Sequence, residues 1–230
     1  LAPLAEVVPW GEPDAPTLHW FGLTQGQYWI AAGQDLLLEY SAAEIAKSRL
    51  PCFCDYYIVR LHEDLLDMLP SILAPVPDDL APWLRRAERD ALQAWEPEAE
   101  EAWDARDLVL SWIGERTLDL GYLSPPADIR LWSDLASVHI AWDNRGVLSG
   151  ETPAWSAQVG SIVVQRSVFE AEVRSFHTRF IEAMAGRVEA VTGGALDPAI
   201  AIDLRQLARE QEQRGRALEA ALSRPSPSTN

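Results

Sequence analysis

The chain has 230 residues, 48% of them hydrophobic, and a formal net charge of −16 at pH 7. This is enough for a full core, in one large domain or two small ones. No run of eighteen apolar residues occurs, which excludes a transmembrane helix. The acidic balance disfavours binding to nucleic acids and to anionic lipids, because both attract basic surfaces.

The amino-terminal part of the chain predicts a strand-rich region. Residues 1–16 contain four prolines and are expected to form an irregular lead-in. Three short runs rich in aromatic and aliphatic residues follow, separated by glycines, and such runs are typical of strands joined by tight turns. The runs are residues 17–23, 27–31 and 36–40. A capping-box pattern at Ser41 and Glu44 then predicts a short helix.

The middle of the chain predicts an acidic helical insertion at about residues 55–117. Apolar residues recur at the helical spacing in three segments, which are 55–69, 79–95 and 98–117, and Pro70 is expected to end the first. Residues 55–107 hold 14 acidic residues and five arginines, a net charge of −9 and more than half of the total. An acidic surface of this kind suits a basic partner, or serves solubility alone.

Strands and then long helices are expected after the insertion. The strand candidates are residues 129–132, 138–142, 155–159 and 161–165. A second capping box, Ser167 with Glu170, predicts a long amphipathic helix to about Val191, and Gly193–Gly194 is its expected end. Asp197 followed by a proline predicts the start of a last helix, residues 197–222, before a disordered tail at 223–230.

This order of strands, helices, strands and helices favours an α+β fold over a doubly wound fold, in which single strands alternate with helices. We expect an antiparallel sheet built from the two strand groups, with helices packed on it. Residues 17–192 would form one domain and the helix at 197–222 would lie outside it. A single sheet is the favoured arrangement, and two separate sheets remain the alternative.

Two cysteines and one histidine are weak candidates for a metal site. Cys52 and Cys54 are separated by one residue, and His62 follows nearby. Structural zinc sites use a two-residue spacer and four ligands, and no second cysteine pair is present. We therefore expect buried, inert thiols, no metal and no other cofactor, because phosphate-binding glycine motifs are also missing. Two adjacent cysteines without other partners favour a reducing cytoplasm.

A catalytic pocket is the weaker of two functional hypotheses. His19 and His139 each lie beside a strand tryptophan, so on a shared sheet they would converge on one face. With Glu39 or Asp143 they would form a general acid–base pocket walled by Trp20 and Trp142. The alternative is that these histidines are hydrogen-bonded surface groups. The reaction of such an enzyme is not evident from the sequence.

The stronger hypothesis is a non-catalytic protein-interaction module of the bacterial cytoplasm. Tryptophan is a common anchor of protein interfaces, and Trp95 and Trp103 have acidic surroundings in the sequence. The predicted partner-binding residues are Trp95, Glu98, Glu100, Glu101, Trp103 and Asp104. The expected partner is a basic protein, for example a toxin neutralised by an immunity-type protein. A homodimer formed through the second strand group or the last helix is a further possibility.

The segments LHWFGLTQGQYWI (18–30) and YYIVRLHEDLLDMLPSILAPVPDDL (56–80) resemble a bacterial family of unknown function. VHIAWDN (138–144), residues 155–164 and FEAEVRSFHTRFIEAMAGRVEAV (169–191) are also similar to it. The resemblance covers most of residues 17–192 and leaves out the last helix. It implies no catalytic residues. The tryptophan-bearing strand pair that leads into a long helix is also similar in style to small bacterial immunity proteins.

Overall fold

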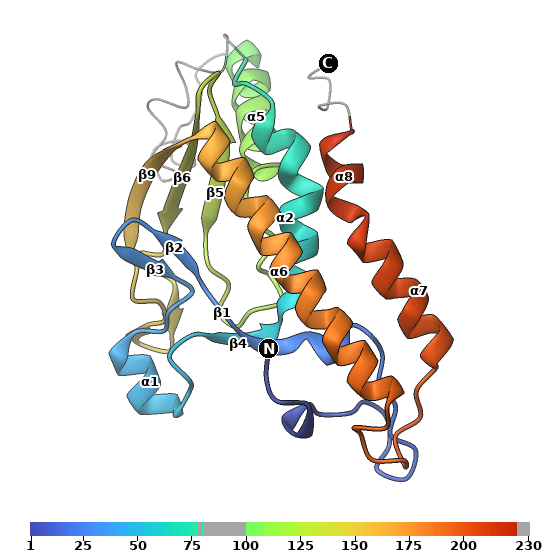
Figure 1. The fold of residues 1–230 in the computed structure, drawn as a ribbon. Helices are drawn as coiled ribbons and strands as arrows, with labels where there is room; N and C mark the ends of the chain where they lie inside the picture. Colours follow the sequence, from blue (N-terminus) through green and yellow to red (C-terminus); the bar gives the residue numbers. More distant parts are fainter. Residues whose placement is uncertain (78–79, 81–99, 225–230) are drawn as a thin grey trace.

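The computed structural model describes residues 1–77, 80 and 100–224 of the chain. It confirms the α+β class: short antiparallel sheets are combined with long helices that follow them (Figure 1). Of the helices in these ranges, none combines the length and the apolar sequence needed to cross a membrane.

The largest sheet has three antiparallel strands in the order β5 (Ile129–Ser133), β6 (Ser137–Asp143) and β9 (Val159–Gln165). Side chains of β6 alternate as the sequence predicts, because alternate residues of a strand point to opposite faces. Trp142 of β6 lies in the core face. Its cross-strand partner is Gly160, where an added Cβ would come within 2.3 Å of the indole ring, so glycine makes room for this tryptophan.

The first strand region differs from the predicted three-stranded meander. β1 (Gln25–Tyr28) pairs with β4 (Cys54–Tyr57), and β2 (Ile30–Ala32) pairs with β3 (Asp35–Leu37). The expected strand at residues 17–23 is wrong: this segment holds isolated bridges at Thr17 and leads into the 3-10 turn η2 (Gly22–Thr24).

The two strand groups also do not form one hydrogen-bonded sheet in the described part of the chain, so the favoured single sheet is wrong. An isolated bridge joins Tyr40 to Trp155, whose rings stack with centroids 4.7 Å apart. A small hairpin of β7 (Leu148–Ser149) and β8 (Thr152–Pro153) precedes this bridge. The chain enters the body through another short turn, η1 (Leu4–Glu6).

The helices predicted at residues 55–69 and 98–117 are present with different bounds. α1 (Ala42–Ser48) has the predicted cap: the Glu44 backbone N–H donates to Ser41 Oγ at 3.1 Å. α2 (Ile58–Leu73) starts three residues late because residues 54–57 are a strand, and it continues past Pro70. α5 (Glu100–Gly114) covers the third predicted helix, while residues 81–95 of the second lie outside the described residues.

The carboxy-terminal helices begin at different residues from those predicted. α6 (Arg166–Thr192) starts before Ser167, with Gln165 at its N-cap, so the second capping box does not form. It ends before Gly193–Gly194 as predicted. The expected last helix is two helices, α7 (Leu204–Gly215) and α8 (Ala217–Leu222), and Asp203 rather than Asp197 caps α7. Residues 225–230 of the predicted tail lie outside the described residues.

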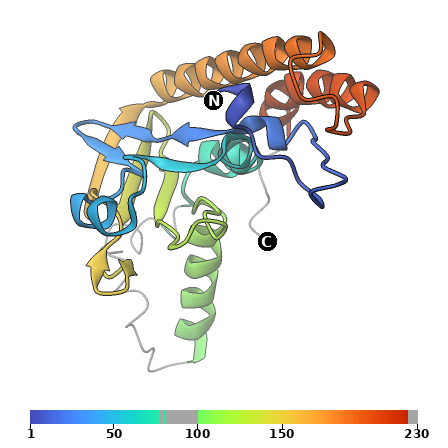
Figure 2. The ribbon, with the colours of Figure 1, turned by 90° about the horizontal axis from the view of Figure 1, so that it is seen from below.

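These last helices share the core of the rest of the chain. α7 packs beside α6, and α8 packs beside α2, on the side of these helices away from the main sheet (Figure 2). Leu207, Leu218 and Ala221 are buried in the same hydrophobic cluster as the strand residues. The sequence beyond residue 192 therefore contributes to the stability of the whole fold.

Candidate functional site

The structure does not bring the two predicted catalytic histidines together. His19 is exposed and lies against Trp10, with ring centroids 5.8 Å apart. His139 stacks on Trp132 at 5.3 Å, and its Nε2 lies 3.1 Å from a carboxylate oxygen of Asp134. The alternation of β6 places His139 on the face opposite Trp142. The pocket expected on a shared sheet is therefore wrong.

The two candidate acids also have partners of their own. Glu39 Oε2 accepts a hydrogen bond from Ser156 Oγ at 2.7 Å. Asp143 forms a bidentate ion pair with Arg145, with N···O distances of 2.7 and 3.0 Å, and this guanidinium holds the pKa of Asp143 below its usual value. Both acids therefore make local contacts with neighbouring side chains, and neither contact joins a nucleophile to a base.

The candidate metal ligands are likewise apart. Cys52 precedes β4 and is exposed, whereas Cys54 is the first residue of β4 and is buried. His62 lies on α2, where its Nε2 is 3.0 Å from Nδ1 of His177 on α6. Within residues 1–77, 80 and 100–224, no group of three or more histidine, cysteine, aspartate or glutamate side chains is placed to hold a metal ion.

Only part of the predicted partner-binding set can be placed. Trp95 and Glu98 lie outside the described residues, and Glu100, Glu101 and Asp104 lie in α5. Trp103 of α5 is 43% exposed, which fits its predicted role at a surface. The guanidinium of Arg106 lies 5.5 Å from its ring centroid, so a cation of the same chain already lies near this indole.

The ribbon of β1 and β4 has two chemically different faces. On the inner face, Tyr28 lies opposite Cys54, and the Tyr28 hydroxyl is 3.4 Å from the hydroxyl of Tyr122. The Tyr122 hydroxyl also lies close enough to the carboxylate of Asp64 on α2 to act on its pKa, and Arg60 lies 5.1 Å from the centroid of the Tyr122 ring. These side chains form a half-buried cluster of ionisable groups, which we call the Asp64 cluster.

Burial dominates the electrostatics of the Asp64 cluster. It raises the pKa of Asp64 to about 6, and Arg60 opposes this shift as the nearest cation. Burial also raises the pKa of the Cys54 thiol to about 11 and the pKa values of Tyr28 and Tyr122 above their usual range. At pH 7 the thiol and both hydroxyls are therefore neutral, and Asp64 carries the negative charge against Arg60.

Replacing Asp64 with asparagine is expected to stabilise the protein by about 1 kcal/mol above pH 6, since partial exposure reduces the full penalty of the buried charge. The folded state holds the Asp64 proton more tightly than the unfolded state, so the penalty is absent below pH 3.8 and grows as pH rises to about 6. Urea unfolding at pH 4 and pH 7.5 measures this. The exposed Asp67→Asn on the same helix is the control, and an equal gain there would contradict the explanation.

The outer face of the same ribbon is aromatic and acidic. Trp29, directly after β1, is 48% exposed and stacks on Phe53 with ring centroids 4.3 Å apart. Asp55 lies on this face two residues beyond Phe53, opposite Gln27. Glu39 bridges to Phe53 from the other side. We call these five residues the Trp29 surface.

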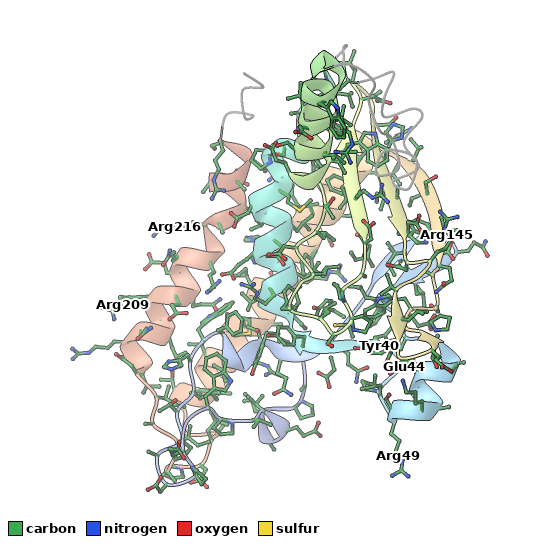
Figure 3. The ribbon with its side chains drawn as sticks, turned by 180° about the vertical axis from the view of Figure 1, so that it is seen from behind. Tyr40, Glu44, Arg49, Arg145, Arg209 and Arg216 are labelled. Atoms are coloured by element: carbon green, nitrogen blue, oxygen red, sulfur yellow. The ribbon has the colours of Figure 1, made fainter. Side chains whose placement is uncertain are left out.

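The segment that carries Glu39 is held in place by neighbouring residues. Tyr40, the next residue, stacks on Trp155 and lies near α1 at one end of the molecule (Figure 3). Ser156 donates its backbone N–H to Glu39 O at 2.8 Å as well as its hydroxyl to the carboxylate. The Glu39 side chain is thereby held beside Phe53 before any partner arrives. One signal of this surface was present in the sequence, because alternation along Gln27, Tyr28 and Trp29 puts the tryptophan on the face opposite the tyrosine.

Comparison with known proteins places the chain in a family. A model described as "Family of unknown function (DUF5984)" matches residues 1–230, so the chain belongs to this family. The match includes the last helices, which the resemblance based on sequence patterns left out. No curated protein and no solved structure matches the chain.

Proposed function

We propose that this member of a family of unknown function is a non-catalytic interaction protein that binds a cationic segment of a partner protein on the Trp29 surface. One observation carries the proposal: a half-exposed indole is stacked on a second aromatic ring and has a carboxylate on either side of the pair. Such an arrangement offers the two kinds of group that bind an arginine or lysine side chain, an aromatic ring and a carboxylate.

The energetics support an anchoring role for Trp29. A cation over a tryptophan ring contributes about 0.5–1 kcal/mol at an exposed site and about 2 kcal/mol when water is excluded. Tryptophan is also among the residues that most often dominate interface affinity. Because Phe53 and Ser156 already hold Trp29 and Glu39 in place, little side-chain entropy is lost on binding.

The charge of the whole chain supports a basic partner. With a net charge of −16, the protein attracts cations from a distance and speeds their association, and it repels acidic competitors. An immunity-type protein that neutralises a basic toxin in the bacterial cytoplasm is one form of this function. Trp103 on α5 is not part of this proposed surface, because Arg106 of the same chain already lies near its ring.

A peptide-binding measurement tests the Trp29 surface directly. The probe is a fluorescein-labelled peptide of alternating arginine and serine, and its Kd is measured by fluorescence anisotropy at low salt. Trp29→Ala is expected to raise Kd at least about tenfold, because it removes the ring that the cation would contact. The double change Glu39→Gln and Asp55→Asn is expected to raise Kd and to flatten its dependence on salt.

Trp103→Ala is the matched control, because Trp103 is exposed to a similar extent, 43% against 48%. It is expected to leave Kd within about twofold, because it is not part of the Trp29 surface. Equal losses for both tryptophans would point to diffuse electrostatic binding. Unchanged affinity in Trp29→Ala would refute the proposed surface. Circular dichroism checks that each variant is folded.

A further inference from the structure

A buried pair of histidines lies where three helices meet. His62 of α2 is 1% exposed and His177 of α6 is 7% exposed, and their rings stack with centroids 5.2 Å apart. His62 Nε2 is 3.0 Å from His177 Nδ1, and His177 Nε2 is 3.3 Å from the carbonyl oxygen of Gly215. Gly215 is the last residue of α7, so the pair connects α2 through α6 to the junction of α7 and α8.

The hydrogen bonds from His62 to His177 and from His177 to Gly215 can form with both rings neutral. His177 Nε2–H donates to the Gly215 carbonyl, which leaves His177 Nδ1 as an acceptor for His62 Nε2–H. Nδ1 of His62 is then unprotonated and is the one ring nitrogen of the pair that lacks a hydrogen-bond partner among the described residues. A proton added at His62 Nδ1 would therefore create a buried cation whose new N–H has no described acceptor.

The surroundings of the pair disfavour a second positive charge. From α7, Arg214 approaches His62, while its guanidinium pairs with Glu63 of α2 and lies 3.9 Å from Glu210 of its own helix. Phe176 and Phe180 of α6 close the remaining sides with apolar rings. Burial, His177 and Arg214 together lower the pKa of His62 to about 3.

Other ion pairs that hold the last helices are exposed. Arg174 of α6 pairs with Glu219 of α8 at 2.8 Å, and Arg224 pairs with Asp67 of α2 at 3.0 Å. Arg209 and Arg216 lie on the outer, solvent-facing side of the last helices (Figure 3). Ion pairs of this exposed kind contribute little, so the buried contacts dominate the attachment of α7 and α8.

We propose that the His62–His177 pair is an acid-sensitive latch, which holds α7 and α8 against α2 and α6 when both rings are neutral and releases them when a ring is protonated. Opening would expose Trp20 and Leu207, which are fully buried in the closed form. The protein would thereby present a new apolar surface in an acidified compartment or medium.

The sign and size of the effect follow from proton linkage. In the open form His62 has its ordinary pKa of 6.5, and in the closed form its pKa is near 3, so the open form binds more protons between these values. The closed form is fully favoured above pH 6.5 and loses stability as pH falls below it. Between pH 7.5 and pH 5.5 the opening equilibrium constant is expected to rise about tenfold.

Hydrogen–deuterium exchange measured by mass spectrometry tests the latch on the full chain. Rates are compared at pH 7.5 and pH 5.5 after correction for the pH dependence of chemical exchange. Peptides covering residues 204–222 are expected to lose about tenfold in protection, while peptides from β5 and β6 keep theirs. Equal loss in both regions would indicate global unfolding and would overturn the latch, as would unchanged protection at 204–222.

Two variants connect the effect to the histidines. His62→Gln keeps a donor near the position of Nε2 but cannot be protonated, so it is expected to abolish the pH dependence of exchange at residues 204–222. His19→Gln removes an exposed histidine and is expected to retain it. If His62→Gln keeps the tenfold response, the latch is refuted. If this variant does not fold, the local loss of protection in the parent chain still decides the question.

Discussion

Replacing Trp20 with alanine is expected to lower the free energy of unfolding by about 3–5 kcal/mol. Trp20 is fully buried and contacts the edge of Phe180, with ring centroids 5.9 Å apart. Its Nε1–H donates to Gln211 Oε1 at 2.8 Å, and Arg214 lies 4.5 Å from its ring centroid. The substitution would leave a cavity between the amino-terminal segment and α6 and remove a hydrogen-bond donor from Gln211. Urea unfolding followed by circular dichroism measures the loss.

Trp29→Ala is the control for this measurement, because the same chemical change is made at a half-exposed site. Its cost is expected to stay below about 1 kcal/mol. If Trp20→Ala proves too unstable to purify, Trp20→Phe keeps one aromatic ring and removes the indole N–H with part of the ring volume, with an expected cost of about 1–3 kcal/mol. A cost for Trp20→Ala no greater than that of Trp29→Ala would contradict its place in the core.

Replacing Asp128 with alanine is expected to destabilise the fold by about 3–5 kcal/mol, because the change leaves a buried cation without its carboxylate. Asp128 and Arg130 are 6% and 8% exposed, and Arg130 bonds both carboxylate oxygens at 3.1 and 3.3 Å. The backbone N–H of Asp128 also donates to the buried Asn144 side chain, which fixes the loop before β5. Urea unfolding at pH 7.5 gives the free-energy change.

The pair of Asp143 and Arg145 provides the comparison, because its cation is exposed. The Asp143 side chain is 11% exposed, but the Arg145 side chain is 48% exposed, so Asp143→Ala leaves a cation that water can solvate, and a loss of less than about 1 kcal/mol is expected. The joint change Asp128→Leu and Arg130→Met is expected to recover much of the loss, because it removes both buried charges. If the joint variant is as unstable as Asp128→Ala, the lost hydrogen bonds of Asp128, rather than the unpaired charge of Arg130, account for most of the lost stability.

Patterns confined to one segment predicted the structure well. The alternation of β6, the Ser41 cap of α1 and the glycine end of α6 depend on residues close in sequence, and each is present. The start of the last helix was missed because two aspartates offer equally good caps. Ala201 is bound to Pro16 and Leu18 by backbone hydrogen bonds, which holds the chain extended after Asp197 and delays the helix to Asp203.

Features built from distant segments could not be predicted in the same way. β1 pairs with β4 across the whole of α1, and nothing in residues 54–57 separates a strand from the first turn of a helix. The His62–His177 pair joins residues 115 positions apart. Trp29 was recognised as a strand residue, yet its exposure depends on which neighbours pair with β1. The tryptophans of the acidic region were predicted to bind a partner from composition alone, and composition does not indicate which side chains point to solvent.

The pairing of Thr17 and Leu18 with Ala201 constrains when this protein can finish folding. The ribosome synthesises the chain from its amino end, so Thr17 and Leu18 emerge more than 180 residues before Ala201. Closing so long a loop is entropically costly and slow. During synthesis the apolar stretch around Trp20 would remain uncovered until the last helices arrive. The amino-terminal segment of this chain therefore becomes covered only when residues near Ala201 have been synthesised.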